Sequence, residues 1–168
     1  MESATFLSYD GGMASDRIDS LGKINLFDGV TREALEAIAS ITEEQTAPAG
    51  TLLFAHGDVG DRLFLILEGK VRISRDIPGM GEEALAVLGP GNVFGELCLF
   101  DDAPRSADAR VHERCRFLCL SRDRFAELLF LHNDIAYDVL WNAVRLLSKR
   151  LRETSDKLTF LSVSAKFT

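Results

Sequence analysis

The pattern of apolar and polar positions begins with helical spacing near the amino terminus. Residues 1–15 carry few large apolar groups and are expected to form a loose leader. Asp16 can then cap a short helix that ends at Leu21, and Thr31 is a good N-cap for a helix that ends near Ile41. The sequence therefore predicts two helices ahead of the main body of the fold.

The pattern changes from Ala47 to Leu120, where short apolar runs alternate with glycines. Val71–Ser74 shows the clearest alternation of apolar and polar positions. Many short strands separated by turn residues are typical of a β-sandwich or barrel, in which glycine supplies the positive φ angles of the corners. The predicted strands are Thr51–Phe54, Leu63–Leu67, Val71–Ser74, Ala84–Leu88, Ala107–Val111 and Arg116–Leu120.

Helical spacing returns after the last of these runs. Ser121 is placed to cap a helix, and the segment 132–134 breaks that helix and starts another. The final helix is predicted from Asp134 to Leu161, with apolar residues at steps of three and four over more than three heptads. Its seam positions are Tyr137, Leu140, Val144, Leu147, Leu151, Thr154, Leu158 and Leu161.

This apolar seam has two interpretations. The helix can lie on its own barrel, or it can pair with a second copy in a parallel coiled coil. A small barrel cannot cover eight seam positions of one straight helix, so we favour a homodimer through the C-terminal helix.

Composition narrows the class of protein. Apolar residues make up 46% of the 168 residues, which suffices for one globular domain. The net charge of −7 disfavours a general nucleic-acid binder, and the sequence has neither an apolar stretch long enough for a membrane span nor a secretory signal. Three widely spaced cysteines do not suggest a disulfide framework, so a reducing, cytoplasmic location is expected.

The segment from Phe94 to Ala107 carries the candidate chemistry. It holds the pair Gly95–Glu96 ahead of the pair Arg105–Ser106. An arginine fork and a serine hydroxyl suit the oxygens of a phosphate, and a carboxylate accepts hydrogen bonds from ligand hydroxyls. The segment therefore suggests a sugar-phosphate ligand, although a structural Glu96–Arg105 salt bridge without a ligand explains the same residues.

Other chemistry finds little support in the sequence. His56, His112 and His132 are far apart and form no His-x-His pair, so no metal site is expected. No nucleophile–base set points to catalysis, so we expect the protein not to be an enzyme. Cys98 is expected to fill the core rather than to act as a redox sensor.

Two stretches resemble a known family. PAGTLLFAHGDVGDRLFLILEGKVRIS and FGELCLFDDAPRSADAR look like the cyclic-nucleotide-binding domain of protein kinase A regulatory subunits and the bacterial catabolite activator protein, over about residues 21–161. The resemblance implies a mainly β fold, an eight-stranded jelly-roll β-barrel followed by a short helix and a long C-terminal helix. The implied divisions are a flexible leader at 1–20, the barrel with its N-terminal helix at 21–132, a dimerisation or lid helix at 133–161, and a tail at 162–168.

The resemblance also assigns roles to site residues. It implies Gly95, Glu96 and Leu97 at the ribose of a cyclic nucleotide, and Arg105, Ser106 and Ala107 at the phosphate. Ile73 and Leu85 match barrel positions that flank the ligand. In the last helix, RLRETSDK is similar to the activator's central helix, which implies Thr154 and Ser155 at the base, Ser155 from the partner subunit, and Arg150 near the site. Thr154 can alternatively be a polar seam residue that sets the register of the coiled coil.

The implied function is a stand-alone cyclic-nucleotide receptor. Its ligand is expected to be a 3′,5′-cyclic purine nucleotide, cAMP rather than cGMP, with signalling through the C-terminal helix and dimer to a possible downstream protein. Only Ser162–Thr168 follow that helix, so DNA binding is not carried over. The alternatives are a constitutive dimerisation or scaffold module with a vestigial pocket, and a fragment of a transcription regulator.

Overall fold

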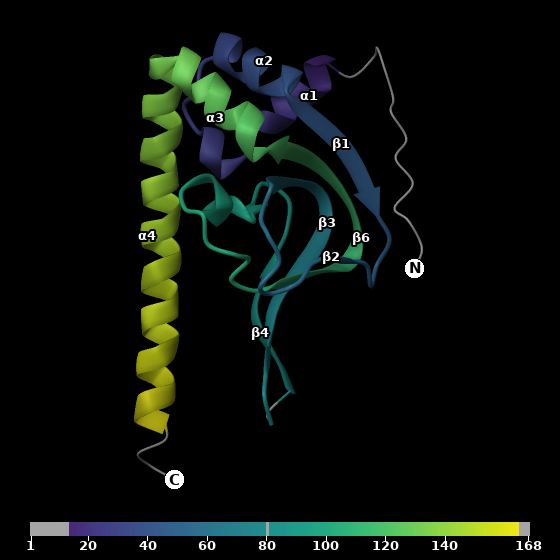
Figure 1. Cartoon of the computed structure of the whole chain (residues 1–168), viewed down its shortest axis with the longest axis vertical. Helices are drawn as coiled ribbons and strands as arrows, with labels where there is room; N and C mark the ends of the chain where they lie inside the picture. Colours follow the sequence, from purple (N-terminus) through teal and green to yellow (C-terminus); the bar gives the residue numbers. More distant parts are fainter. Residues whose placement is uncertain (1–13, 80, 165–168) are drawn as a thin grey trace.

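The computed structural model describes residues 14–79 and 81–164 and shows a curved sheet with helices at one end and a long helix along its side (Figure 1). The helices are α1 (Ala14–Leu21), η1 (Asn25–Phe27), α2 (Arg32–Ser40), η2 (Glu96–Leu99), α3 (Arg122–Leu131) and α4 (Asn133–Ser164). The strands are β1 (Thr42–Ala47), β2 (Leu52–Phe54), β3 (Arg62–Ile77), β4 (Gly81–Leu88), β5 (Val93–Phe94) and β6 (Asp108–Ser121). Helices α1, α2 and α3 gather at one end of the sheet, whereas α4 extends far past them.

The sheet is antiparallel and is organised around its two longest strands. Its order is β1-β6-β3-β4, with β2 paired to β6 and β5 paired to β3. Strands β3 and β6 are therefore central, and β1 and β4 lie at the edges. This arrangement confirms the expected class, mainly β with flanking helices.

The expected count of eight strands is wrong for the described residues, which form six. The runs Leu63–Leu67 and Val71–Ser74 are two parts of β3, and the last two predicted runs are likewise parts of β6. The β3–β6 pairing continues through register shifts between Ile66 and Val71, where the chain bends without ending the strand. Gly69 sits in this bend with φ of 82°, and a Cβ there would lie 2.2 Å from the Arg114 carbonyl oxygen.

The central strands are buried on both faces, which explains why their apolar runs are continuous. In β3, Leu63 and Leu65 pack into the cluster beneath the helices, whereas Phe64 and Ile66 pack into a second cluster inside the curved sheet. Strand β6 repeats the division, with Leu118 and Leu120 toward the helices and Phe117 and Cys119 inside. Successive side chains of a strand point to opposite faces, so one strand serves both cores.

Strand β1 was not predicted. Its sequence is TEEQTA, and only its terminal residues Thr42 and Ala47 are buried. It pairs with β6 over its whole length at one edge of the sheet. A polar edge strand carries no strong hydrophobic pattern, because most of its stability comes from backbone pairing with its neighbour.

Both predicted N-terminal helices are present, but the predicted cap of the first is wrong, because α1 begins at Ala14 and Asp16 lies inside its first turn. The Thr31 hydroxyl accepts a hydrogen bond from the Ala34 backbone N–H at 3.3 Å and caps α2. Helix α1 begins at Ala14 and buries Ile18 and Leu21 in the core, so residues 14–20, which the predicted division placed in the leader, are a packed helix. The remainder of the expected leader, residues 1–13, lies outside the described residues.

The long helix α4 is attached to the body mainly through its first half. Val139 and Ala143 are buried there, and Asn142 Nδ2 donates to the carbonyl oxygens of Leu26 at 3.3 Å and Asp28 at 2.7 Å. From Leu151 to residue 160 every side chain is exposed. Within the described segments, no helix, α4 included, combines the length and apolar character needed to cross a membrane.

The buried face of α4 is not the predicted seam. Seam residues on the described helix are largely exposed, from Tyr137 at 71% and Val144 at 53% to Leu151 at 68% and Leu158 at 60%. The interpretation in which the seam lies on the chain's own barrel is therefore wrong for these positions. The body buries a neighbouring face of α4, with Val139 and Ala143 on it, and these four seam residues stay largely exposed.

Candidate functional site

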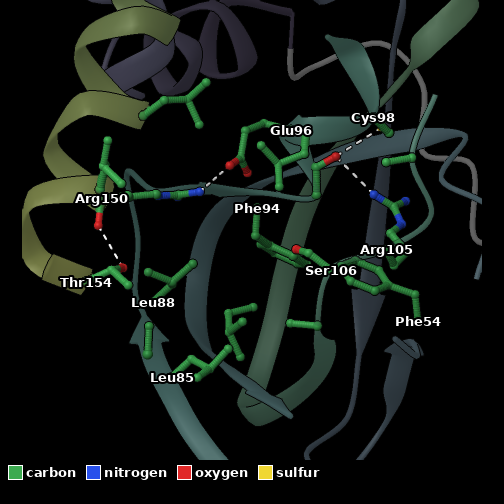
Figure 2. A pocket seen from close by; sticks show the side chains of 18 of the residues that line it. Phe54, Leu85, Leu88, Phe94, Glu96, Cys98, Arg105, Ser106, Arg150 and Thr154 are labelled. Atoms are coloured by element: carbon green, nitrogen blue, oxygen red, sulfur yellow. Dashed lines mark hydrogen bonds and ion pairs between the residues drawn. The ribbon is translucent and has the colours of Figure 1, made fainter. Parts of the chain in front are cut away.

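A cavity of about 480 Å³ lies between the sheet, the segment 94–107 and α4 (Figure 2). Residues from β2, β3 and β4 form its floor and one wall, and α4 forms the opposite wall. Ten of the eleven predicted site residues line it: Ile73, Leu85, Gly95, Glu96, Leu97, Arg105, Ser106, Ala107, Arg150 and Thr154.

The Gly-Glu and Arg-Ser pairs meet in this cavity because the chain turns sharply between them. Gly95 has φ of 72° and is the cap of η2, and a Cβ at this position would lie 2.6 Å from Arg105 Nη1. Any other residue would therefore be strained and would also displace the guanidinium. A single helical turn, the 3₁₀ helix η2, follows Gly95 directly.

Arg105 is a buried cation held by neutral groups. The residue is 6% exposed. Its Nη1 donates to the Gly95 carbonyl oxygen at 2.9 Å and its Nη2 to the Arg62 carbonyl oxygen at 2.7 Å. Within the described segments no carboxylate lies at ion-pair distance from Arg105, and Arg105 Nε has no hydrogen-bond partner. No described carboxylate therefore neutralises the guanidinium, which can pair with an anionic ligand.

Glu96 pairs with a different arginine from the one considered in the sequence. Its side chain is 5% exposed, and Oε1 accepts a hydrogen bond from Arg150 Nη1 of α4. Arg150 Nη2 donates to the Val93 carbonyl oxygen, so the same guanidinium joins α4 to β5. The interpretation of Glu96 and Arg105 as a structural salt bridge is wrong, because the Glu96 carboxylate pairs with Arg150 instead.

Polar groups of α4 line the opposite wall. Thr154 Oγ1 donates its hydrogen to the Arg150 carbonyl oxygen at 2.9 Å. The lone pairs of the Thr154 hydroxyl oxygen can still accept a hydrogen bond. Lys157 Nζ donates to the Leu85 carbonyl oxygen at 2.8 Å and so joins α4 to β4. Ser155 does not line the cavity; its exposed side chain lies beside the seam residues Leu151 and Leu158, four residues after the first and three before the second.

Cys98 lies in the cavity wall and is 4% exposed. Its Sγ donates to the Gly95 carbonyl oxygen at 3.0 Å. Burial raises the pKa of this thiol, although the nearby Arg105 guanidinium opposes the effect. A buried, neutral thiol that packs beneath the turn matches the expected role as a core residue.

Two of the cavity-lining residues that the sequence did not assign to the site make specific contacts there, Phe54 and Lys157. The distance from the Phe54 ring centroid to Arg105 Cζ is 4.1 Å. Lys157 joins α4 to β4 through its hydrogen bond to the Leu85 carbonyl oxygen. In the sequence, Phe54 is one of many apolar residues in predicted strands, and Lys157 is one of many charged residues on a predicted helix. Their contacts in the site depend on long-range packing, which the sequence pattern does not specify. In residues 14–79 and 81–164 no group of three or more His, Cys, Asp or Glu side chains could hold a metal.

The comparisons with known proteins point to one family. Residues 44–132, more than half of the chain, match the family described as "Cyclic nucleotide-binding domain". The chain is 34% identical over 141 residues to the "CRP-like cAMP-activated global transcriptional regulator" of Mycobacterium tuberculosis, covering 84% of this chain and 61% of that protein. It is 37% identical over 137 residues to the "Cyclic AMP receptor protein" of Thermus thermophilus, covering 82% and 62%.

The fold has a solved counterpart of similar length. A cyclic nucleotide-binding domain from Methylobacillus flagellatus superposes with a TM-score of 0.77 at 31% identity, covering 90% of this chain and 92% of that one. By contrast, the chain spans about three fifths of the two regulators it matches. By sequence match and by fold, the chain belongs to the cyclic nucleotide-binding domain family.

Proposed function

We propose that this chain is a non-enzymatic, cytoplasmic receptor module for a 3′,5′-cyclic purine nucleotide, with cAMP preferred, and that it signals as a homodimer through α4. The observation that carries the proposal is the cavity itself. It contains a buried carboxylate, Glu96, and a buried guanidinium, Arg105, that are not neutralised by each other.

Arg105 is assigned to the cyclic phosphate. Its guanidinium is buried among backbone carbonyls, so an anion with two exocyclic oxygens would complete its surroundings. Ser106 lies beside it in the cavity wall and can donate a hydroxyl to the same group. Gly95 and Ala107 leave room for the ligand to approach the backbone.

Glu96 and Leu97 are assigned to the ribose. A carboxylate accepts hydrogen bonds, so Glu96 suits the 2′-hydroxyl, and its hydrogen bond from Arg150 fixes the orientation of the carboxylate. Ile73 and Leu85 supply apolar contact on the β3 and β4 side of the cavity.

The preference for cAMP follows from Thr154. Its hydroxyl proton is directed to the Arg150 carbonyl, so the oxygen faces a ligand as an acceptor. Position 6 of the purine is a donor amine in adenine and an acceptor carbonyl in guanine. Ser155, exposed beside the seam, is assigned to the cavity of the partner subunit.

The dimer proposal is supported by the open seam of α4. Leu140, Val144, Leu151 and Leu158 are each more than 40% exposed along one side of the helix. A second α4 would cover this stripe. Because α4 also forms a wall of the cavity, a bound nucleotide would act on the helix that carries the dimer surface.

Calorimetric titration of cAMP and cGMP tests the binding site. We expect the wild type to bind cAMP more tightly than cGMP, and Arg105→Ala or Glu96→Ala to weaken binding at least 10-fold while remaining folded. Arg114→Ala, an exposed arginine outside the cavity, is the matched control and should bind as the wild type. Unchanged affinity in both cavity variants would refute the site. A thermal-shift screen in which no cyclic mono- or dinucleotide stabilises the wild type would favour a scaffold module instead.

Light scattering tests the dimer. Leu140→Glu should convert a dimer into a monomer, because it places a charge on the seam at a position outside the cavity lining. Leu52→Glu changes a leucine on β2 with the same exposed fraction as Leu140, 45%, and should leave the oligomeric state unchanged. A wild type that is monomeric both with and without cAMP would refute this part of the proposal.

A further inference from the structure

An aromatic ring lies directly against the buried cation of the site. The Phe54 ring centroid is 4.1 Å from Arg105 Cζ, a short distance for a cation–π contact. Phe54 is half-buried and lines the cavity from β2 (Figure 2). It belongs to none of the segments that carry the resemblance-based assignments at the ribose, phosphate or base.

The ring is itself held in place by other rings. Phe54 lies 6.0 Å from both Phe64 and Phe94, and those two rings stack at 4.9 Å. Phe117 packs edge-on against Phe64 and Phe94. The four rings come from β2, β3, β5 and β6, so the position of Phe54 is fixed by the whole interior of the sheet.

Arg105 has few other restraints. Two of its nitrogens bind the carbonyls of Gly95 and Arg62, its Nε has no partner, and the described residues offer it no ion pair. Two hydrogen bonds fix the edge of a guanidinium but leave its plane free to tilt. The face of Phe54 supplies the missing restraint and places the negative side of the ring's quadrupole against the cation.

We propose that Phe54 is a positioning residue for phosphate recognition: its ring supports the Arg105 guanidinium from one face and pre-organises it for the anion. This inference rests on the proposed function, because it concerns how the assigned phosphate-binding residue is held. A pre-organised group loses less conformational freedom on binding, so the contribution of Phe54 should appear as ligand affinity.

The first experiment compares two substitutions of Phe54 by calorimetric titration with cAMP. Phe54→Leu removes the ring and should weaken binding about 3- to 30-fold. Phe54→Tyr keeps the ring and should bind within about 3-fold of the wild type, since tyrosine also supports cation–π contacts. Wild-type affinity in Phe54→Leu, or a Tyr variant as weak as the Leu variant, would overturn the proposal. Phe54→Met, which keeps a long apolar side chain, replaces the Leu variant if that one does not fold.

The second experiment needs no ligand. A double-mutant cycle of Phe54→Leu and Arg105→Met, followed by urea unfolding, measures whether the two residues stabilise the fold jointly. We expect the two single effects not to sum in the double variant. Phe27→Leu combined with Arg105→Met should be close to additive, because Phe27 is buried in the other core cluster, against Phe125, and does not contact the rings around Phe54. An additive Phe54–Arg105 cycle would overturn the proposal. A wild type that binds no cyclic nucleotide would refute the proposed function, and the cycle would still decide whether Phe54 holds Arg105.

Discussion

Replacing Arg150 by methionine removes the one cation that pairs with Glu96 in the described structure. The Glu96 side chain is 5% exposed and that of Arg150 is 29% exposed. Removing one partner of a fully buried pair costs about 3–5 kcal/mol, because the other charge stays buried, whereas an exposed pair contributes about 0.2–1 kcal/mol. One buried and one partly exposed partner place this pair between the two cases. We expect Arg150→Met to lower the free energy of unfolding by about 2 kcal/mol.

Urea unfolding and thermal melting of the ligand-free protein measure this loss. For a chain of this size, about 2 kcal/mol corresponds to a fall in Tm of about 4–8 °C. Lys149→Met is the matched control: its cation lies on the same helix, is 74% exposed and reaches Glu153 at 4.0 Å. It should change the free energy of unfolding by less than about 0.5 kcal/mol.

The decisive variant is the double one. Glu96→Gln in the Arg150→Met background removes the buried carboxylate that has lost its partner, so the double variant should be more stable than Arg150→Met alone. If Arg150→Met melts within 1 °C of the wild type, or if Glu96→Gln destabilises the double variant further, the burial argument for this pair fails.

Three further outcomes follow from other contacts. Lys157→Met loses the hydrogen bond to the Leu85 carbonyl that joins α4 to β4; cAMP should dissociate about 2- to 10-fold faster in stopped-flow measurements, and an unchanged rate would argue against a role for this bond in retaining ligand. Asn142→Ala removes both side-chain bonds that tie α4 to the η1 turn, so urea unfolding should report a loss of about 1–3 kcal/mol, and a loss below 0.5 kcal/mol would contradict it. Burial raises the pKa of Cys119 from 9.0 to about 12; its stabilising contribution is complete below pH 9 and is lost as pH rises toward 12, because the unfolded thiol ionises first, so a Cys119→Ala variant should lose less stability between pH 8 and 10 than the wild type does.

Much of the fold was predictable because it depends on local patterns. Thr31 marks the start of a helix, the central apolar runs mark β3 and β6, and three- and four-residue spacing marks α4. The number of strands was not predictable from those runs, because the bend at Gly69 ends the apolar pattern without ending the backbone pairing with β6. Strand β1 was not predicted, because its side chains show no alternation of apolar and polar residues although its backbone pairs with β6 along its whole length.

The sequence by itself determined which residues could bind a sugar phosphate, since Gly95, Glu96, Arg105 and Ser106 lie on one short segment whose ends a compact turn brings together. Only the tertiary structure decided how these charges are distributed. Glu96 is paired by Arg150, which is 54 residues away, and Arg105 rests on Phe54, which comes from a different strand. A sequence pattern specifies which face of an element is buried, but which two side chains meet depends on how β2 pairs with β6 and how α4 packs on η1. Those long-range contacts leave Arg105 free for an anion and make α4 a wall of the same cavity.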